Sequence, residues 1–157
     1  MDRISQKHRS WNMSRILGKH TRPEVAVRSL LHRHGYRFRL HRRDLPGKPD
    51  IVLAKYQTAV FVQGCFWHRH TGCEFAYTPK SNIAFWRTKF RENVARDKRN
   101  HARLRALGWQ VLCVWECETR EPERLLRRVS RALKMKRKSN ARRRLTEAID
   151  TRDETTN

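Results

Sequence analysis

The 157-residue chain has no run approaching twenty consecutive apolar residues, which excludes a membrane-spanning helix. Its first stretch, 1–10, is polar and lacks the apolar segment of a secretory signal, so we expect a protein that is not secreted. Acidic residues are also scarce, since 15 Asp and Glu stand against 37 Lys and Arg, for a net charge of +22. Because solubility needs far less charge, this excess predicts a polyanionic partner.

The chain also lacks the features of a disulfide-rich or a disordered protein. Only four cysteines are present, and in a chain that stays inside the cell we expect them to be reduced and available as thiolates for a metal. The hydrophobic fraction of 38% and the five tryptophans exclude a wholly disordered basic chain. The length suits one domain with a substantial core.

Hydropathy patterns predict that this domain is of the α/β class. The clearest local signal is Thr21-Arg22-Pro23-Glu24, which has a capping hydroxyl, a first-turn proline and a glutamate three residues after the cap. Strands are indicated by alternation or short apolar runs, and helices by apolar residues at three- and four-residue spacing. We expect a helix over about 22–34, strands over 36–41, 51–54 and 59–62, a long helix over about 82–107, a strand over 109–115 and a last helix over about 122–134.

The order of these elements predicts a small mixed β-sheet flanked by helices. Residues 1–20 show no sustained period and are interpreted as an N-terminal arm, followed by one domain over 21–134. Residues 64–79 are too rich in Cys, His and Gly for a regular element. Residues 135–157 form a polar tail that we expect to be disordered, and the basic run 134–144 suits a non-specific nucleic-acid contact.

A candidate metal site is formed by Cys65, His70 and Cys73, with Cys117 just past the strand 109–115. Three thiolates and one imidazole are a tetrahedral set that zinc prefers, and four protein ligands would make the zinc structural. The alternative is that these cysteines are small buried hydrophobes. The interpretation as a buried hydrophobe suits Cys113, which lies inside an apolar strand. His68, two residues before His70, is an alternative histidine ligand for the metal.

A second candidate site begins at Pro49-Asp50, which opens a strand after a loop rich in Gly and Pro. Restriction-type nucleases place a carboxylate at such a strand end, where it can hold Mg²⁺ against a phosphate. The pattern alone is also ordinary turn chemistry. The usual Glu-x-Lys partner on the next strand is missing, since that strand reads Phe61-Val62-Gln63-Gly64-Cys65.

A longer set of motifs carries more information. Over about 12–117 the chain resembles the very-short-patch repair DNA mismatch endonucleases, which nick one strand beside a T·G mismatch left by deamination of 5-methylcytosine. The resemblance is carried by Asp50, Gly64-Cys65-Phe66-Trp67-His68, His70, Cys73, Phe85-Trp86, Asn93-Val94, Arg96-Asp97 and Trp115-Glu116-Cys117.

The resemblance implies a restriction-endonuclease-like core with a structural zinc site and a catalytic Mg²⁺. Asp50 and the main-chain carbonyl of Val62 would bind Mg²⁺, and His68 would be the general base that activates water. The family's zinc site matches Cys65, His70, Cys73 and Cys117. Further matches are the acidic positions Glu24 and Asp97, the aromatic wedges Phe66, Trp67 and Trp86, and the arm residues Asn12 and Met13, which would reach the opposite groove of the DNA.

The chain departs from the family pattern at two positions, where Val62 and Gln63 replace a threonine and a histidine. A main-chain ligand survives the first change. Glutamine cannot shuttle a proton, however, so His68 would carry more of the proton transfer. Gln63 therefore favours an alternative in which the chain is a non-catalytic, zinc-stabilised nucleic-acid-binding protein, while Asp50 and His68 favour the enzyme.

Several of these residues also have purely structural interpretations. Glu24 fits a capping box, Asp97 lies on a charged helical face, and Trp86 has the spacing of a core residue. Phe66 and Trp67 differ, because adjacent aromatics in such a loop cannot both enter one core, and we expect them to be exposed. We expect a monomer in the bacterial cytoplasm, associated with the nucleoid, acting on double-stranded DNA alongside a cytosine-5 methyltransferase and a repair polymerase. A nuclease that is not mismatch-directed is a further alternative.

Overall fold

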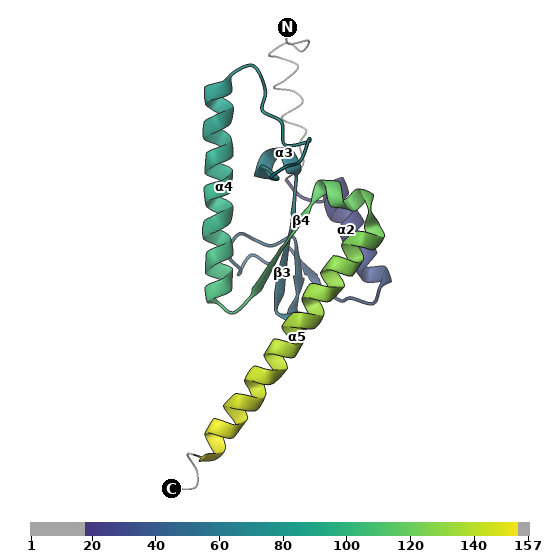
Figure 1. Ribbon diagram of the computed structural model, residues 1–157, viewed down its shortest axis with the longest axis vertical. Helices are drawn as coiled ribbons and strands as arrows, with labels where there is room; N and C mark the ends of the chain where they lie inside the picture. Colours follow the sequence, from purple (N-terminus) through teal and green to yellow (C-terminus); the bar gives the residue numbers. More distant parts are fainter. Residues whose placement is uncertain (1–17, 154–157) are drawn as a thin grey trace.

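A computed structural model describes residues 18–153, with side chains over 18–144 (Figure 1). Asn12, Met13 and most of the predicted arm lie outside the described residues. None of the described helices is long and apolar enough to cross a membrane. The elements are α2 (Arg22–Arg33), β1 (Arg39–Leu40), β2 (Ile51–Leu53), the 3-10 helix η1 (Ala54–Tyr56), β3 (Thr58–Gln63), α3 (Cys65–His68), α4 (Ile83–Ala106), β4 (Gln110–Trp115), the 3-10 helix η2 (Glu116–Arg120) and α5 (Pro122–Asp153).

The four strands form one sheet in the order β1-β2-β3-β4. The pairs β1-β2 and β2-β3 are antiparallel, whereas β3 and β4 are parallel, with Val60 opposite Leu112. The long helix α4 provides the crossover between the two parallel strands, as parallel pairing requires. The prediction of a small mixed sheet flanked by helices is confirmed.

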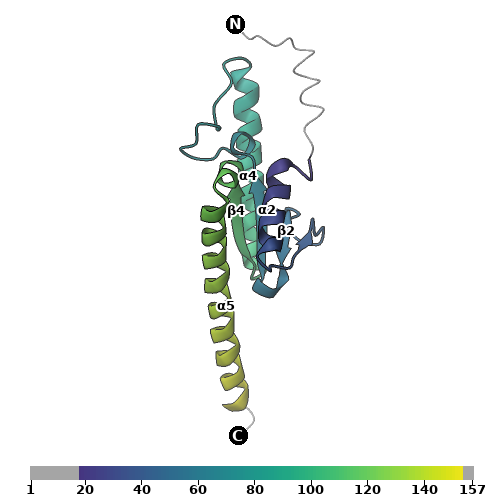
Figure 2. The same ribbon diagram turned by 90° about the vertical axis from the view of Figure 1, so that its right-hand side faces the viewer.

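Helices cover both faces of this sheet (Figures 1 and 2). On one face α2 and α5 pack against the strands, where Leu31, Val60 and Leu133 belong to one buried cluster. On the other face Leu104 of α4 packs on Val52 and Ala59. Buried branched residues fill both faces of β2 and β3, which is typical of strands enclosed between two helical layers.

Two elements differ from the sequence-based expectation near the first strands. β1 has only two residues, both exposed, although alternation predicted a half-buried strand over 36–41. Tyr36 and Phe38 do pack against the core, but from the chain just before the strand. The segment 64–79, expected to be irregular, contains the short helix α3. Helical turns of four residues are too short to produce a hydropathy period.

The end of the last helix was also predicted wrongly. α5 continues to Asp153, whereas the spacing of apolar residues predicts that it ends at about 134 and is followed by a disordered tail. The charge pattern was interpreted as disorder, yet residues 123–153 contain neither Gly nor Pro. Lys, Arg, Ala, Leu and Glu are strong helix formers, so the helix has no local reason to stop.

Candidate functional site

A cleft of about 800 Å³ lies where the end of β3 meets the start of β2. Antiparallel pairing of Ile51 with Val60 places Asp50, the residue before β2, beside the last residues of β3. The cleft therefore collects side chains that are far apart in the sequence. Among its lining residues are Glu24 of α2, Asp50, Val62 and Gln63 of β3, Trp67 and His68 of α3, and Asp97 and His101 of α4.

Asp50 is held at the base of this cleft by the neighbouring strand. The main-chain N–H of Val62 donates to Asp50 Oδ2 at 2.7 Å. Burial raises the pKa of the Asp50 carboxyl to about 6, against the hydrogen bond from Val62, and the nearby charge of Glu24 raises it further. Loss of water destabilises the ionised form, so this carboxylate would gain from a cation.

The loop before Asp50 approaches α4 closely. Gly47 has φ +75°, and a Cβ there would lie 2.9 Å from the Cβ of Asn100. Only glycine accommodates both the backbone angle and this contact. Lys48, which follows Gly47, also has positive φ, and both residues line the cleft. The turn thus fixes how the chain enters Asp50.

Glu24 reaches the cleft although it also caps α2. Thr21 is the N-cap residue, and its hydroxyl donates to Glu24 Oε1 at 3.0 Å, while the N–H of His20 donates to Oε2 at 3.0 Å. The predicted capping interaction is therefore present. Glu24 is nevertheless buried, and its ligand-type oxygens lie within 4.8 Å of those of Asp50 and of a ring nitrogen of His41. The structural and the functional interpretations of Glu24 are compatible.

Two residues of this corner, Arg28 and His41, were missed by the sequence analysis. Arg28 donates to Glu24 Oε2 at 2.8 Å and contacts His41 Nε2 at 2.9 Å. Burial lowers the pKa of His41, and the charge of Arg28 lowers it further, so the neutral ring accepts this hydrogen bond. Arg28 lies one helical turn after Glu24, which was the available signal, but nothing in the sequence marks His41 as its neighbour.

His68 and Asp97 form a close pair across the cleft. Their Nδ1 and Oδ2 atoms lie 2.5 Å apart, and both side chains are about one-fifth exposed. α3 begins after Gly64 and ends at Arg69 in the left-handed region, which aims His68 at α4. Asn93 Nδ2 of α4 donates to the carbonyl of Trp67 and so joins the two helices. With Nδ1 engaged by a carboxylate, Nε2 is the ring atom that can accept a proton.

Gln63 and His101 also line the cleft. Gln63 is 5% exposed and occupies the end of β3 opposite Trp115, where the family pattern has histidine. His101 lies one turn after Asp97 on α4, and burial lowers its pKa. Its ring packs at 4.8 Å from that of Phe61 and its Nε2 is 4.0 Å from the Cys113 sulfur. Cys113, expected to be a core residue, is half-buried and packs beside this ring.

The four predicted zinc ligands lie together behind α3. The ligand atoms of Cys65, His70, Cys73 and Cys117 are all within 4.8 Å of one another. His70 Nδ1 is 3.6 Å from the Cys65 sulfur and 3.4 Å from that of Cys117. A tetrahedral zinc with ordinary bond lengths separates such atoms by roughly 3.6 Å. The His70 ring stacks on Trp115 at 4.3 Å, which fixes its orientation.

Burial raises the pKa of the Cys65 thiol to about 12 and also raises the pKa of Cys117. A bound cation would offset this cost of ionising Cys65 and Cys117, and the ligand atoms of the four residues lie close enough together to share one ion. Donor type, number and spacing therefore suit a soft divalent ion. The structure brings together the complete predicted ligand set and leaves His68 outside it.

The three predicted aromatic wedges form one cluster. Phe66 contacts Trp67 and Trp86 with ring centroids 5.2 and 5.3 Å apart. Trp86 is 7% exposed, which agrees with its core-residue spacing and leaves its predicted DNA contact a prediction, and Phe66 and Trp67 are half-buried. The expectation that both are exposed was wrong, because α4 covers them. The exposed aromatics at this end are Phe85, 57% exposed, and Tyr77, 63% exposed.

The fold of the chain has a counterpart among solved structures. It is similar to the solved "Homing Endonuclease I-Bth0305I Catalytic Domain", with a TM-score of 0.53 and 19% identity, over 74% of this chain and 97% of that domain. The model of the family described as "DNA mismatch endonuclease Vsr" matches residues 1–74.

Proteins related in sequence have higher identities to this chain than that solved domain has. The chain is 54% identical to the type II nicking enzyme V.XorIIP of Xanthomonas oryzae, over 74% of this chain and 85% of that enzyme. It is 44% identical to the DNA mismatch endonuclease Vsr of Escherichia coli, over 74% of each chain. It is 41% identical to the nicking enzyme V.NmeAIP of Neisseria meningitidis, over 85% of this chain and 94% of that enzyme. The chain belongs to the Vsr family of DNA mismatch endonucleases.

Proposed function

We propose that this chain nicks one strand of duplex DNA beside a T·G mismatch in a Mg²⁺-dependent reaction. The observation that carries the proposal is that Asp50 and the His68–Asp97 pair line one cleft. A base and a cation-binding carboxylate on opposite sides of one phosphate are what phosphodiester hydrolysis requires. This is the restriction-endonuclease-like arrangement expected from the family.

His68 is proposed to be the general base. Asp97 accepts the Nδ1 proton, which fixes the tautomer and leaves the Nε2 lone pair to take a proton from water. When that proton is transferred, the Asp97 carboxylate stabilises the resulting imidazolium. Gln63 can orient the water or a phosphate oxygen by hydrogen bonding, although it cannot exchange the proton.

Asp50 is proposed to hold the Mg²⁺, with the Val62 carbonyl as the second protein ligand. Bound Mg²⁺ would neutralise charge on the phosphate and the leaving oxygen. Hard oxygen ligands suit this ion, which keeps several waters and accepts substrate oxygens. Glu24 lies near enough to add negative charge to the site. The Val62 N–H orients the Asp50 carboxylate toward the cleft.

The cluster of Cys65, His70, Cys73 and Cys117 is proposed to hold a structural zinc. All four ligands come from the protein, so the ion would have no open position for chemistry. Its effect would be to connect α3 to the end of β4. Because His68 lies between Cys65 and His70 in the sequence, bracing this loop orients the proposed base.

Mismatch selectivity is proposed to come from the aromatic cluster. A T·G pair is weaker than a Watson–Crick pair, so separating its neighbouring base steps costs less. Phe66 and Trp67 both pack on the buried Trp86, which gives the wedge a rigid base, and Trp67 lines the cleft. Asn12 and Met13 are proposed to contact the opposite groove.

The relatives named above come from bacteria, which supports a role in bacterial DNA repair in the cytoplasm, at the nucleoid. The product of 5-methylcytosine deamination is a T·G mismatch, so we expect a cytosine-5 methyltransferase to act upstream and a repair polymerase downstream. We expect the protein to act as a monomer, because one chain supplies every proposed catalytic group.

One assay tests the proposal. End-labelled duplexes carrying T·G or C·G are incubated with the protein in Mg²⁺ or EDTA, and nicking of only the T·G duplex, only with Mg²⁺, is expected. Asp50→Ala should abolish nicking and retain binding. Asp44→Ala is the matched control, since Asp44 is an exposed carboxylate paired with Arg42 outside the cleft. Equal nicking by Asp50→Ala and the parent would refute the role of Asp50.

The same assay detects the second candidate function, a non-catalytic nucleic-acid-binding protein. The specific observation in its favour is Gln63 in place of histidine. Retarded mobility of both duplexes without nicking under any metal condition would support it. Gln63→His would then restore the imidazole. Nicking by this variant would show that the chain is disabled at that one position, and no nicking would support a protein that only binds.

A further inference from the structure

The outer face of α5 carries a continuous row of positive side chains. Leu125, Val129 and Leu133 are buried at four-residue spacing and turn one face of the helix to the core. Side chains on the opposite face recur every three or four residues and are exposed. We call this row the α5 ridge, and it consists of Arg124, Arg127, Arg131, Lys134, Lys138 and Arg142.

Little negative charge opposes the ridge. No Asp or Glu occurs between Arg124 and the glutamate at position 147. Arg124 and Arg127 pair with Glu121 at 3.5 Å and Glu123 at 4.0 Å, and both pairs are exposed, where ion pairs contribute little. Arg128 is different, since it donates to Glu118 and to the Cys113 carbonyl, and it has a structural role.

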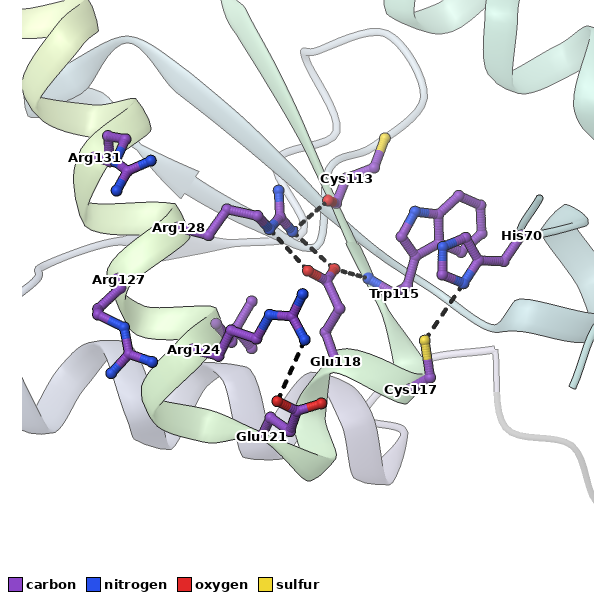
Figure 3. A pocket seen from close by; sticks show the side chains of 11 residues that line it. His70, Cys113, Trp115, Cys117, Glu118, Glu121, Arg124, Arg127, Arg128 and Arg131 are labelled. Atoms are coloured by element: carbon purple, nitrogen blue, oxygen red, sulfur yellow. Dashed lines mark hydrogen bonds and ion pairs between the residues drawn. The ribbon is translucent and has the colours of Figure 1, made fainter. Parts of the chain in front are cut away.

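The ridge starts close to the catalytic cleft. Figure 3 shows the pocket of about 890 Å³ between α5 and the end of β4, with arginines of α5 on one side and His70 and Cys117 on the other. The neighbouring residue Glu116 lines the catalytic cleft. A single short segment, 115–118, therefore separates the two hollows.

The ridge ends far beyond the sheet. Lys136 Nζ donates to the carbonyl of Gly108, at the end of the sheet opposite the cleft, and Leu133 is the last buried residue among the α5 side chains described, which run to position 144. Figures 1 and 2 show the rest of α5 extending past every other described element. From Arg124 to Arg142 the helix is about 27 Å long, which matches about eight base pairs of duplex.

We propose that the α5 ridge is a second DNA-binding surface, which contacts backbone phosphates of the substrate duplex outside the mismatch. This inference rests on the proposed function for the identity of the duplex. Exposed cations at intervals of about 4.5–6 Å suit a line of phosphates. An acidic protein would need apolar anchors as well, and Met135 is the one exposed large apolar residue on the described part of α5.

The test removes three ridge charges without touching the fold. Arg131→Gln, Lys134→Gln and Lys138→Gln are combined, because all three side chains are exposed and glutamine keeps helix propensity. Binding to T·G duplexes of about 12 and about 40 base pairs is measured against salt concentration. On the long duplex the slope of log K against log salt should shrink by up to about 2.7, from about 0.9 per lost phosphate contact. On the short duplex it should change less.

The matched control is Arg33→Gln, Arg37→Gln and Arg39→Gln, which removes the same charge from the exposed β1 side of the molecule. A long-duplex slope equal to that of this control would overturn the proposal. Nicking of the short duplex under saturating protein should equal that of the parent. If neither the parent nor the ridge variant nicks DNA, but the long-duplex salt slopes of the ridge and control variants differ, the α5 ridge binds DNA and the proposed function is wrong.

Discussion

Asp50 is an ionisable side chain in a place where ionisation is unfavourable. It is mostly buried beside Glu24, and its carboxyl has a pKa of about 6. Folding therefore favours the protonated form, whose stabilisation is complete below about pH 3.8 and is lost as the pH rises through about 6. At neutral pH the ionised side chain costs stability, which is a common property of residues kept for function.

Asp50→Asn should consequently raise the free energy of unfolding at pH 7, by about 1–3 kcal/mol, while abolishing nicking. The amide oxygen can still accept the Val62 N–H. The gain should disappear near pH 4, where the parent carboxyl is protonated. Denaturant unfolding at both pH values measures it, with Asp44→Asn as the exposed control. A gain of equal size at both pH values would contradict the assigned pKa.

The pair of His68 and Asp97 gives a second prediction at the scale of residues. Asp97→Asn should lower the single-turnover nicking rate by about 10²- to 10⁴-fold, because the imidazolium loses its partner and the tautomer is no longer fixed. Binding to the mismatched duplex should be nearly unchanged. Glu92→Gln removes an exposed carboxylate from the same helix and serves as the control. A rate loss matched by an equal loss of binding would assign Asp97 to DNA contact.

At the scale of elements, the loop that carries α3 depends on groups distant in the chain. α3 has only four residues, too few to be stable alone. It is connected to α4 by the Asn93 hydrogen bond and to the end of β4 by the Cys/His cluster. The position of His68 is therefore set by neighbours, and removal of the cluster should affect activity and stability together.

Cys73→Ser should lower the melting temperature by on the order of 10 °C, because a lost ligand removes metal-binding energy from folding. A strong chelator should reproduce the change in the parent and have little further effect on the variant. Cys113→Ala is the control, since that thiol lies outside the cluster. A melting curve identical to that of the parent, with or without chelator, would rule out a structural ion here.

For the whole molecule, α5 divides into a core part and a projecting part. Leu125, Val129 and Leu133 pack on the sheet, and Lys136 donates to the Gly108 carbonyl at the lower end of β4. A chain ending after Asn140 should melt within about 2 °C of the full chain, since the side chains described beyond that point, 141–144, are all exposed. A chain ending after Leu126 loses Val129 and Leu133 and should not fold, because each truncated core position costs several kcal/mol. Thermal unfolding by circular dichroism distinguishes the two. A large drop for the longer chain would show that the projecting part stabilises the domain.

The sequence by itself determined what depends on neighbours along the chain. Capping at Thr21 and Glu24, the spacing of apolar residues in α4 and the apolar runs of β2 and β3 predicted these elements close to their observed bounds. Family motifs also picked out residues that the structure brings together in the cleft and in the Cys/His cluster. Local patterns failed where charge was interpreted as disorder, in α5, and where a helix was too short for a period, in α3.

The tertiary structure alone decided which groups meet. Arg28 and His41 lie 13 positions apart, and their contact at the Glu24 corner follows from how α2 packs beside the chain leaving β1. The packing of the half-buried Phe66 and Trp67 against α4 and the raised pKa of Asp50 arise in the same way. Hydrogen bonding and dehydration act through space, so they depend on packing that no local pattern records.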